Sequence, residues 1–456
     1  MPRLAAASLA GTAIEFYDFF VYGTAAALIL GPLFFPTFSP VAGTLAAFAT
    51  FGVGFVARPL GSVLFGHIGD RRGRRPVLVA SLLLTGASTV AVGCVPTYDT
   101  IGVLAPLLLL VLRFLQGLGL GGEWGGAVLL TVEHAPAERR GLWSSFPQVG
   151  PAVGFLLANG VVLGLSATLS EAQFAAWGWR VPFWAAGVLA LVGLWLRSSL
   201  PESPSFLELD DHARVPIAEV LRDHWRLLLL TGGALAIGYA IFYAVTTWSL
   251  AYGTERLGVS RTVMLTCIMG AVLVKGALTP LVAMLGDRYG RRPMCLAGCA
   301  AAAVWMFPMV AFLATGRPLP MFLGFLGAML SFITMFAVIA AYLPELYEPR
   351  VRCTGAAVGY NLGGVLGGAL TPIVATALAE QGGRVPWGVA AYLTAIALVS
   401  LGCFALLPET RPVPGEAGAK AEAEAEAGAG AGSGAGAGAG SGAGAGSGSG
   451  SGTPTG

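Results

Sequence analysis

The sequence predicts an all-α membrane protein with twelve transmembrane helices in two pseudo-symmetric six-helix halves. The 456-residue chain is 55% hydrophobic and only 11% charged, whereas soluble domains carry about 25% charged residues. Its apolar segments repeatedly reach the ~20 residues that a helix needs to cross a bilayer. In addition, one short basic phrase occurs twice, about half a chain apart, which is typical of a duplicated membrane protein.

The apolar segments are separated by short polar connections. The first contains Glu15 and Asp18, which a cleaved signal sequence would not carry, so we expect it to remain as a helix. The predicted spans are residues 5–30, 43–67, 76–96, 102–132, 142–165, 181–199, 226–250, 262–285, 294–314, 319–343, 354–379 and 387–407.

The duplication sets the expected organisation of the chain. Three pairs of segments keep their order: 69–76 with 286–293, 133–141 with 345–355, and 201–203 with 408–410. We therefore expect an N-terminal half at 1–200, a cytoplasmic linker at 201–225 and a C-terminal half at 226–411. The remaining 412–456 is dominated by Gly, Ala and Ser and cannot bury a core, so disorder is expected there.

Arginine placement predicts the orientation. Alternate connections hold most of the arginines, and both termini lie on the same side as these connections. By the positive-inside rule, this side is cytoplasmic, and the protein is expected in the plasma (inner) membrane with both termini inside the cell. The arginines concerned are Arg71, Arg72, Arg74, Arg75, Arg139, Arg140, Arg214, Arg222, Arg288, Arg291, Arg292, Arg350 and Arg352.

Several other classes of protein are disfavoured. The six cysteines form no CxxC pair and no cluster with histidine, so no metal site and no cofactor is expected. The four histidines lie at or near the cytoplasmic ends of helices and form no catalytic set. No nucleotide-binding loop is present, and a channel would not need the half-length duplication. The chain is therefore not expected to be an enzyme or an ATP-driven pump.

Four phrases resemble the major facilitator superfamily, and within it the metabolite:proton symporter branch. They lie at 11–23, 113–127, 178–183 and 359–364. The branch includes carriers for proline/betaine, α-ketoglutarate, citrate and shikimate, and the resemblance covers about residues 8–412. It implies symport with protons by alternating access. The tail lacks the apolar heptads of the osmosensing members, which disfavours that role.

The repeated phrase predicts two conformational latches. Each aspartate follows a helix end and would be stabilised by a helix N-terminus from the opposite half. Helix eleven, beginning near Thr354, is expected to serve Asp70, and helix five, beginning near Gly141, is expected to serve Asp287. The alternative is a topology signal with a tight glycine turn. The predicted latch residues are Asp70, Arg71, Arg74, Asp287, Arg288 and Arg291.

Intramembrane charges predict the proton-coupling site, since each costs about 3 kcal/mol on insertion scales. Glu15 and Asp18 share one helix face at mid-depth, where Arg113 of helix four can meet them. A carboxylate that loses its arginine partner is easily protonated, and proton coupling needs this change. The alternative is a static ion pair. Glu123 is either a second proton carrier or a partner of Arg58.

Lys275 is the one lysine in the predicted membrane region and lies near mid-depth of helix eight. It suits a substrate carboxylate, and the alternative is an ion pair with Glu15 or Asp18. Polar and aromatic residues within helices are candidates to complete the substrate site, and among them Tyr360 and Asn361 are favoured. The candidates are Tyr17, Gln148, Asn159, Tyr239, Tyr243, Trp248, Tyr360 and Asn361.

These features predict a secondary transporter that imports a small organic acid together with protons. The anion preference rests on Arg113 and Lys275. A zwitterion such as proline or betaine is the alternative, because the intramembrane charges of the two signs balance. The expected partners are the substrate, protons and the bilayer, with no nucleic acid, and the carrier is expected to act as a monomer.

Overall fold

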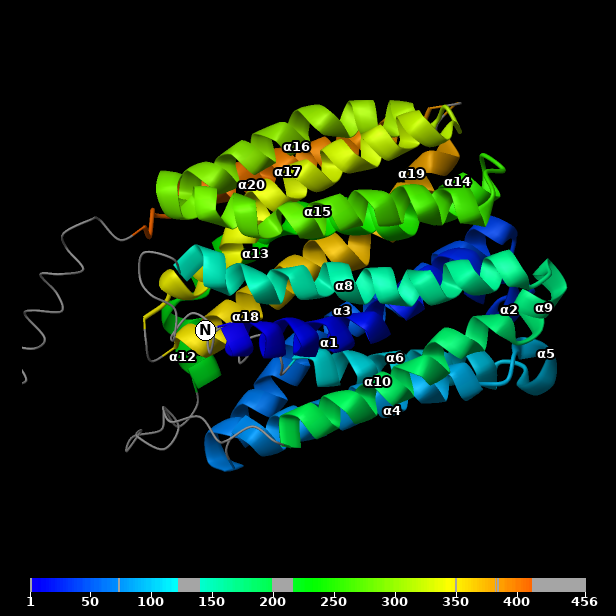
Figure 1. Ribbon diagram of the computed structural model, residues 1–456, viewed down its shortest axis with the longest axis horizontal. Helices are drawn as coiled ribbons and strands as arrows, with labels where there is room; N and C mark the ends of the chain where they lie inside the picture. Colours follow the sequence, from blue (N-terminus) through cyan, green and yellow to red (C-terminus); the bar gives the residue numbers. More distant parts are fainter. Residues whose placement is uncertain are drawn as a thin grey trace, which may run out of the picture. The chain divides into compact units, whose positions relative to one another are not determined.

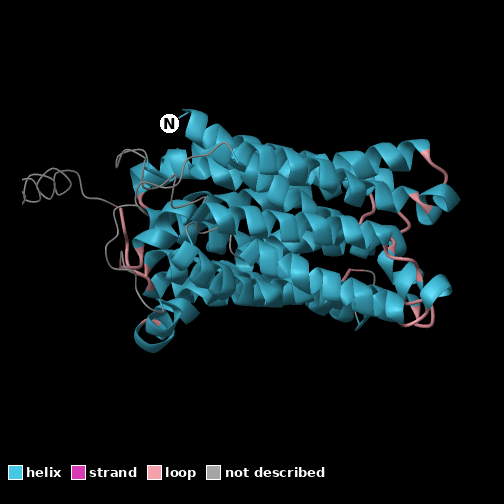
Figure 2. Ribbon diagram, turned by 90° about the horizontal axis from the view of Figure 1, so that it is seen from below, coloured by secondary structure: helices cyan, strands magenta, loops and turns pink. Residues whose placement is uncertain are grey.

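The computed structural model describes residues 2–72, 74–121, 140–198, 216–348, 351–381, 383 and 385–411. Within these ranges, side chains are described except at 2–7, 66, 67, 69–72, 74–78, 140, 195–198, 216 and 353. Every regular element in the described ranges is a helix (Figures 1 and 2). Residues up to Arg411 belong to one compact unit.

The helices of the predicted N-terminal half run side by side along the bundle. They are α1 (Pro2–Leu28), α2 (Leu30–Phe34), α3 (Pro40–Arg72), α4 (Arg74–Cys94), α5 (Tyr98–Ile101), α6 (Leu104–Gly121), α8 (Arg140–Thr168), α9 (Glu171–Ala176), η2 (Gly178–Arg180) and α10 (Val181–Ser198). A short helix, α12 (Pro216–Asp223), precedes the second half.

The helices of the predicted C-terminal half include two π-helical segments, η3 and η4, each continuous with its neighbours. They are α13 (Trp225–Tyr243), η3 (Ala244–Trp248), α14 (Ser249–Glu255), α15 (Arg261–Tyr289), α16 (Arg291–Leu313), α17 (Pro318–Glu345), α18 (Arg352–Gly363), η4 (Gly364–Ala369), α19 (Leu370–Gln381) and α20 (Trp387–Leu406).

Each of the twelve predicted spans coincides with helical structure in the described residues. Nine of the described helical stretches are long and apolar enough to cross a membrane, and Val79–Cys94 and Gly178–Leu194 are shorter apolar helices. The remaining span is α1, which is 27 residues long. Within a bilayer, helices form because every backbone polar group must be satisfied inside the segment.

Different chain ends and helix ends lie at the two ends of the bundle. The chain begins with α1 and leaves α20 at the same end, which we call the termini end (Figure 1). The helix starts of α8 and α16 also lie there, whereas α5, α9 and α14 lie at the opposite end. The sharp reversal between α15 and α16 at the termini end requires Gly290, whose φ is +106°.

The two predicted halves meet along two lines of helix contact. One line joins α8 to α15, and the other joins α3 to α18, η4 and α19. Close approach depends on small residues. A Cβ at Gly276 on α15 would lie 2.9 Å from that of Ala152 on α8, and a Cβ at Gly368 on η4 would lie 2.6 Å from the Phe55 ring on α3. The candidate site lies between these two lines.

Candidate functional site

A small cavity lies between the two predicted halves. It has a volume of about 40 Å³, room for a few water molecules. α1 and α8 line it on one side, and α13, α15, α17 and α18 on the other. Its lining residues are Phe16, Phe20, Gln148, Pro151, Tyr239, Phe242, Tyr243, Lys275, Thr279, Phe332, Ile333, Phe336, Ala337 and Tyr360.

Lys275 is the cationic side chain in this lining, and it is only 2% exposed. Its Nζ lies 5.0 Å from the centre of the Phe332 ring. Among the described residues, no carboxylate lies within ion-pair distance of Lys275. The ammonium group is therefore removed from water and is stabilised mainly by an aromatic face, an interaction of about 2 kcal/mol when desolvated.

The predicted substrate residues divide into two groups. Gln148 and Tyr360 line the cavity with Lys275, and Gln148 Nε2 also lies 3.4 Å from the Phe336 carbonyl of the other half. Tyr17 and Asn361 are absent from the cavity lining. The Tyr17 hydroxyl instead donates to the Pro182 carbonyl at 3.0 Å.

Asn361 contributes to the contact between the halves. Its Nδ2 donates to Ser62 Oγ on α3 at 2.9 Å, and Ser62 in turn donates to the Gly121 carbonyl of α6 at 2.5 Å. A membrane asparagine needs a hydrogen-bond partner, and here another helix supplies it. The sequence indicated that Asn361 has a partner, but not which one.

The sequence analysis did not favour several residues that line the cavity. Tyr239 and Tyr243 on α13 were among the wider candidates and Phe332 on α17 was not named, because nothing in those apolar stretches distinguishes cavity-facing from packing aromatics. Thr279 is different, because it follows Lys275 by one helical turn and shares its face. Helical spacing from Lys275 was therefore the one signal that pointed to a missed residue.

A second polar cluster lies inside the predicted N-terminal half. The Arg113 guanidinium is fully buried and donates to Gln116 Oε1. Gln116 Nε2 lies 2.7 Å from the Thr89 hydroxyl and 3.3 Å from the Asp18 carbonyl. The Gln116 amide therefore links Arg113 on α6 to α1 and α4.

The predicted coupling residues Glu15 and Asp18 are both buried, 4% and 1% exposed. Asp18 lies close enough to Arg113 for an electrostatic interaction. However, the polar contact that the Arg113 side chain makes in the described region is with Gln116, not with a carboxylate. Its guanidinium also lies over the Phe19, Tyr22 and Phe51 rings at 4.3, 4.4 and 4.9 Å.

Arg58 on α3, like Arg113, lies against aromatic rings. Its guanidinium lies 4.2 Å from the Phe19 ring centre and 4.7 Å from that of Phe55, so Phe19 contacts both Arg58 and Arg113. Both arginines keep buried Nε groups without a hydrogen-bond partner in the described part of the chain. Glu123, the predicted partner of Arg58 or second proton carrier, lies outside the described residues.

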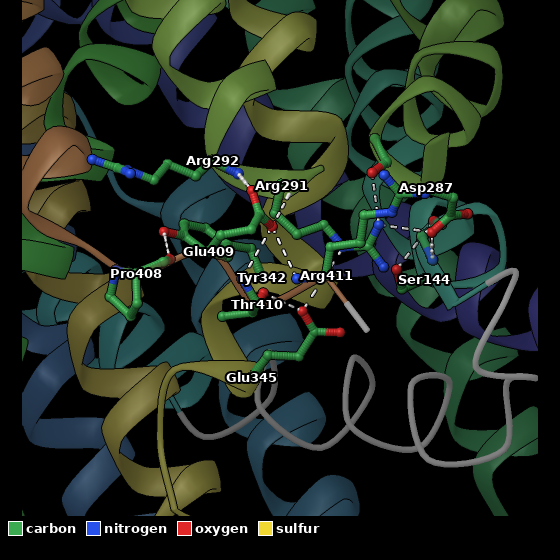
Figure 3. A network of polar contacts seen from close by, with 12 residues as sticks. Ser144, Asp287, Arg291, Arg292, Tyr342, Glu345, Pro408, Glu409, Thr410 and Arg411 are labelled. Atoms are coloured by element: carbon green, nitrogen blue, oxygen red, sulfur yellow. Dashed lines mark hydrogen bonds and ion pairs between the residues drawn. The ribbon is translucent and has the colours of Figure 1, made fainter. Parts of the chain in front are cut away.

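Asp287 lies at the N-terminus of a helix from the other half (Figure 3). Its Oδ1 accepts from the Gly141 backbone N–H at 2.9 Å, and its Oδ2 accepts from the Leu142 N–H at 3.0 Å. Both donors belong to the first turn of α8, where unpaired N–H groups favour an anion. A Cβ at Gly141 would lie 2.6 Å from the Asp287 carboxylate, so the glycine permits this contact.

Arg291 connects Asp287 to the end of the C-terminal half (Figure 3). Its Nη1 lies 2.8 Å from Asp287 Oδ1, and its Nε lies 3.8 Å from Glu345 Oε2. Glu409 accepts from the backbone N–H groups of Arg291 and Arg292, at 2.9 and 3.0 Å. Glu345 and Glu409 were noticed in the sequence as members of repeated phrases, but no role was assigned to them.

The remaining predicted latch residues are placed differently. Arg288 is exposed and lies 5.5 Å from the Tyr289 ring rather than in the network of Arg291. The side chains of Asp70, Arg71 and Arg74 are outside the described part of the structure.

At the opposite end of the bundle, two contacts also join the halves. The Thr44 hydroxyl on α3 lies 3.1 and 3.2 Å from the two carboxylate oxygens of Glu255 on α14. Arg261 on α15 forms a 2.8 Å ion pair with Glu171 on α9. In this conformation the halves are therefore joined at both ends.

A helical membrane bundle with a buried cavity between two joined halves is the architecture of a carrier. Comparison with known proteins agrees with it. Residues 4–226 match the family model of sugar (and other) transporters, and residues 257–439 match that of the major facilitator superfamily.

Three relatives from Escherichia coli cover nearly the whole chain. The inner membrane metabolite transport protein YhjE of Escherichia coli is 43% identical over 90% of this chain and 94% of its own. The E. coli shikimate transporter is 39% identical over 90% and 95%, and the E. coli proline/betaine transporter is 34% identical over 91% and 85%.

Solved structures show the same fold. The partially occluded inward-open xylose transporter XylE of E. coli matches with a TM-score of 0.71 and 20% identity, covering 90% of this chain and 98% of that chain. The chain belongs to the major facilitator superfamily, within the group of metabolite transport proteins that its relatives represent. It is a multi-pass membrane transporter and not an enzyme.

Proposed function

We propose that this protein imports a small organic acid together with protons across the inner membrane by alternating access. The observation that carries the proposal is Lys275. It is a buried cation in the cavity between the halves, and no described carboxylate pairs with it. A substrate carboxylate entering the cavity would form a charge-assisted hydrogen bond with it in a site from which water is largely removed.

The rest of the cavity suits the body of such a substrate. Aromatic rings supply apolar contact on several sides, and Gln148, Tyr360 and Thr279 offer polar groups. Small-molecule sites commonly combine apolar walls with a few placed polar groups. The cavity of about 40 Å³ is smaller than an organic acid, so the halves must part slightly to admit it.

Proton coupling is assigned to Glu15, Asp18 and Arg113. Both carboxylates are buried, and Asp18 lies near the Arg113 guanidinium, whose described hydrogen bond goes to Gln116. Burial disfavours ionised carboxylates, and a nearby arginine favours them. A small movement of Arg113 between Gln116 and Asp18 would therefore change the proton affinity of Asp18. Glu123 remains a proposed second carrier or partner of Arg58.

The contacts at the two ends support alternating access. We place the termini end in the cytoplasm, so the Asp287 contact with α8 closes the cytoplasmic side and favours the outward-facing state. Thr44–Glu255 and Glu171–Arg261 close the other side. Transport requires these contacts to break in turn as one half rocks against the other. Asp70, with Arg71 and Arg74, is proposed as the second cytoplasmic latch.

The organic-acid assignment is favoured by the relatives named for metabolite and shikimate transport, at 43% and 39% identity. Import of a zwitterion is the second candidate, because the proline/betaine transporter is 34% identical. Lys275 favours the first, since a betaine brings its own cation to a cavity that already contains one.

The test is uptake into membrane vesicles carrying the protein, with an imposed pH gradient. The panel contains labelled mono- and dicarboxylates, shikimate, proline and glycine betaine. We expect acid-driven uptake of at least one organic acid that an uncoupler abolishes. Uptake of zwitterions alone would contradict the organic-acid assignment, and uptake insensitive to the uncoupler would contradict proton symport.

A further inference from the structure

The cavity around Lys275 has unusually aromatic walls. Phe332 stacks on Phe336 with ring centres 4.5 Å apart, and Phe242 meets Phe332 at 5.7 Å with the rings tilted by 50°. Tyr239 meets Phe336 edge-on at 5.7 Å. These four rings, which we call the aromatic box, form one contiguous cluster in the cavity wall, and the Phe332 ring lies beside the Lys275 ammonium.

Aromatic boxes of this kind have a defined chemical preference. A ring face attracts a cation within about 6 Å of its centre, and sets of such faces recognise quaternary ammonium groups. In this protein a cation is already in place, because Lys275 Nζ lies 5.0 Å from the Phe332 ring centre. The Lys275 ammonium thus occupies the position in which the cationic group of a ligand would otherwise bind.

We propose that Lys275 acts as a tethered ligand of the aromatic box and thereby determines the charge of the substrate. With Lys275 in place, its ammonium occupies the Phe332 face of the box and the cavity presents a positive charge, so it takes a carboxylate. With a small neutral side chain at this position, the same walls take a quaternary ammonium group. This inference rests on the proposed function, in which the cavity is the substrate site.

Two features support this change of ligand preference on replacement of Lys275. The first is space, because Lys275→Ala would remove the stem and ammonium, leaving room beside Phe332. The second is charge. Glu15 and Asp18 are buried in the facing half, so loss of the lysine charge makes the surroundings of the cavity more negative, which favours a cation.

The main experiment measures equilibrium binding of labelled glycine betaine and of tetramethylammonium to the purified full-length carrier. We expect Lys275→Ala to bind both at least tenfold more tightly than the wild type. Lys275→Met is the matched control, because its neutral side chain still fills the box, and no gain is expected. Adding Phe332→Leu to Lys275→Ala should remove the gain, since the ring face is lost.

Uptake of the organic acid identified in vesicles is measured on the same variants. Loss of acid uptake without any gain in betaine or tetramethylammonium binding would overturn the inference and leave the proposed function standing. Unchanged acid uptake in Lys275→Ala would overturn the proposed function itself. If Lys275→Ala is not monodisperse on size-exclusion chromatography, Lys275→Ser is used, with the same expected gain and the same contradicting result.

Discussion

In the proposed function, single side chains decide what this cavity binds, and Lys275 is the first of them. Its burial is costly because an ammonium group loses its hydration, and the ring of Phe332 offsets only part of that cost. A carboxylate ligand offsets more. Binding of a substrate anion would therefore offset the desolvation cost that the buried ammonium group bears in the empty carrier.

The prediction for Lys275 concerns charge. Lys275→Gln should raise the KM for organic-acid uptake at least tenfold, because the charge-assisted hydrogen bond is lost, whereas Lys275→Arg should keep part of the affinity. Initial rates at equal surface expression measure this. Arg222→Gln is the control, because Arg222 lies on α12 with 88% of its side chain exposed, and it should behave as wild type. An unchanged KM in Lys275→Gln would refute the role.

Gly54 is a second residue with a measurable consequence. A Cβ at this position would lie 2.7 Å from Arg113 Nε, so Gly54→Ala should displace the guanidinium from Gln116 and the rings around it. We expect a loss of about 1–3 kcal/mol of stability, as for other overpacked cores, and weaker coupling of uptake to the pH gradient.

The matched control is Gly164→Ala on α8, where an added Cβ meets nothing within 4 Å in the described structure. Thermal unfolding of the solubilised protein and the ratio of uptake with and without a pH gradient are measured for both variants. Equal stability of the two variants would contradict the packing argument at Gly54.

At the scale of elements, the N-terminus of α8 binds the Asp287 carboxylate of the other predicted half. Asp287 satisfies two backbone N–H groups that the helix itself leaves unpaired. Contacts of this kind are typically worth 0.5–2 kcal/mol, enough to shift an equilibrium between two conformations several-fold. We therefore propose that the helix start serves as a releasable contact between the predicted halves.

The prediction for Asp287 follows from this geometry. Asp287→Ala should slow uptake and increase labelling of a cysteine placed at the cytoplasmic face of the cavity, because the inward-facing state is no longer opposed. Asp287→Asn keeps one acceptor and should show a smaller effect. Asp223→Asn on α12, with 57% of its side chain exposed, is the control. Wild-type rates and labelling in Asp287→Ala would exclude the latch.

At the scale of the whole molecule, the contacts at the two ends are proposed to act on one conformational equilibrium. Thr44→Val deprives Glu255 of a hydroxyl donor at the opposite end, and should favour the outward-facing state. Because Thr44 and Asp287 share no partner, their effects should add. The double variant Thr44→Val with Asp287→Asn should therefore return cysteine labelling towards the wild-type level. Labelling equal to that of Asp287→Asn alone would contradict this balance.

The transmembrane pattern was predictable to a large degree. Each predicted span coincides with helical structure, because a bilayer leaves an apolar stretch of ~20 residues few alternatives to a helix. The meeting of Asp287 with the start of α8 was also anticipated, since both partners are marked by charge and by helix ends. The site was less predictable, because Tyr17 and Asn361 face other helices while Tyr239, Tyr243 and Phe332 line the cavity.

The sequence alone determined the class of protein and the number of spans, because hydrophobicity depends only on order along the chain. The tertiary structure decided which side of each helix meets the cavity. An aromatic or polar side chain in an apolar helix has the same local pattern whether it packs against a neighbour or lines a void. Only the packing of the helices placed Lys275 of α15 beside Phe332 of α17, and Asp287 of α15 at the start of α8 in the other predicted half.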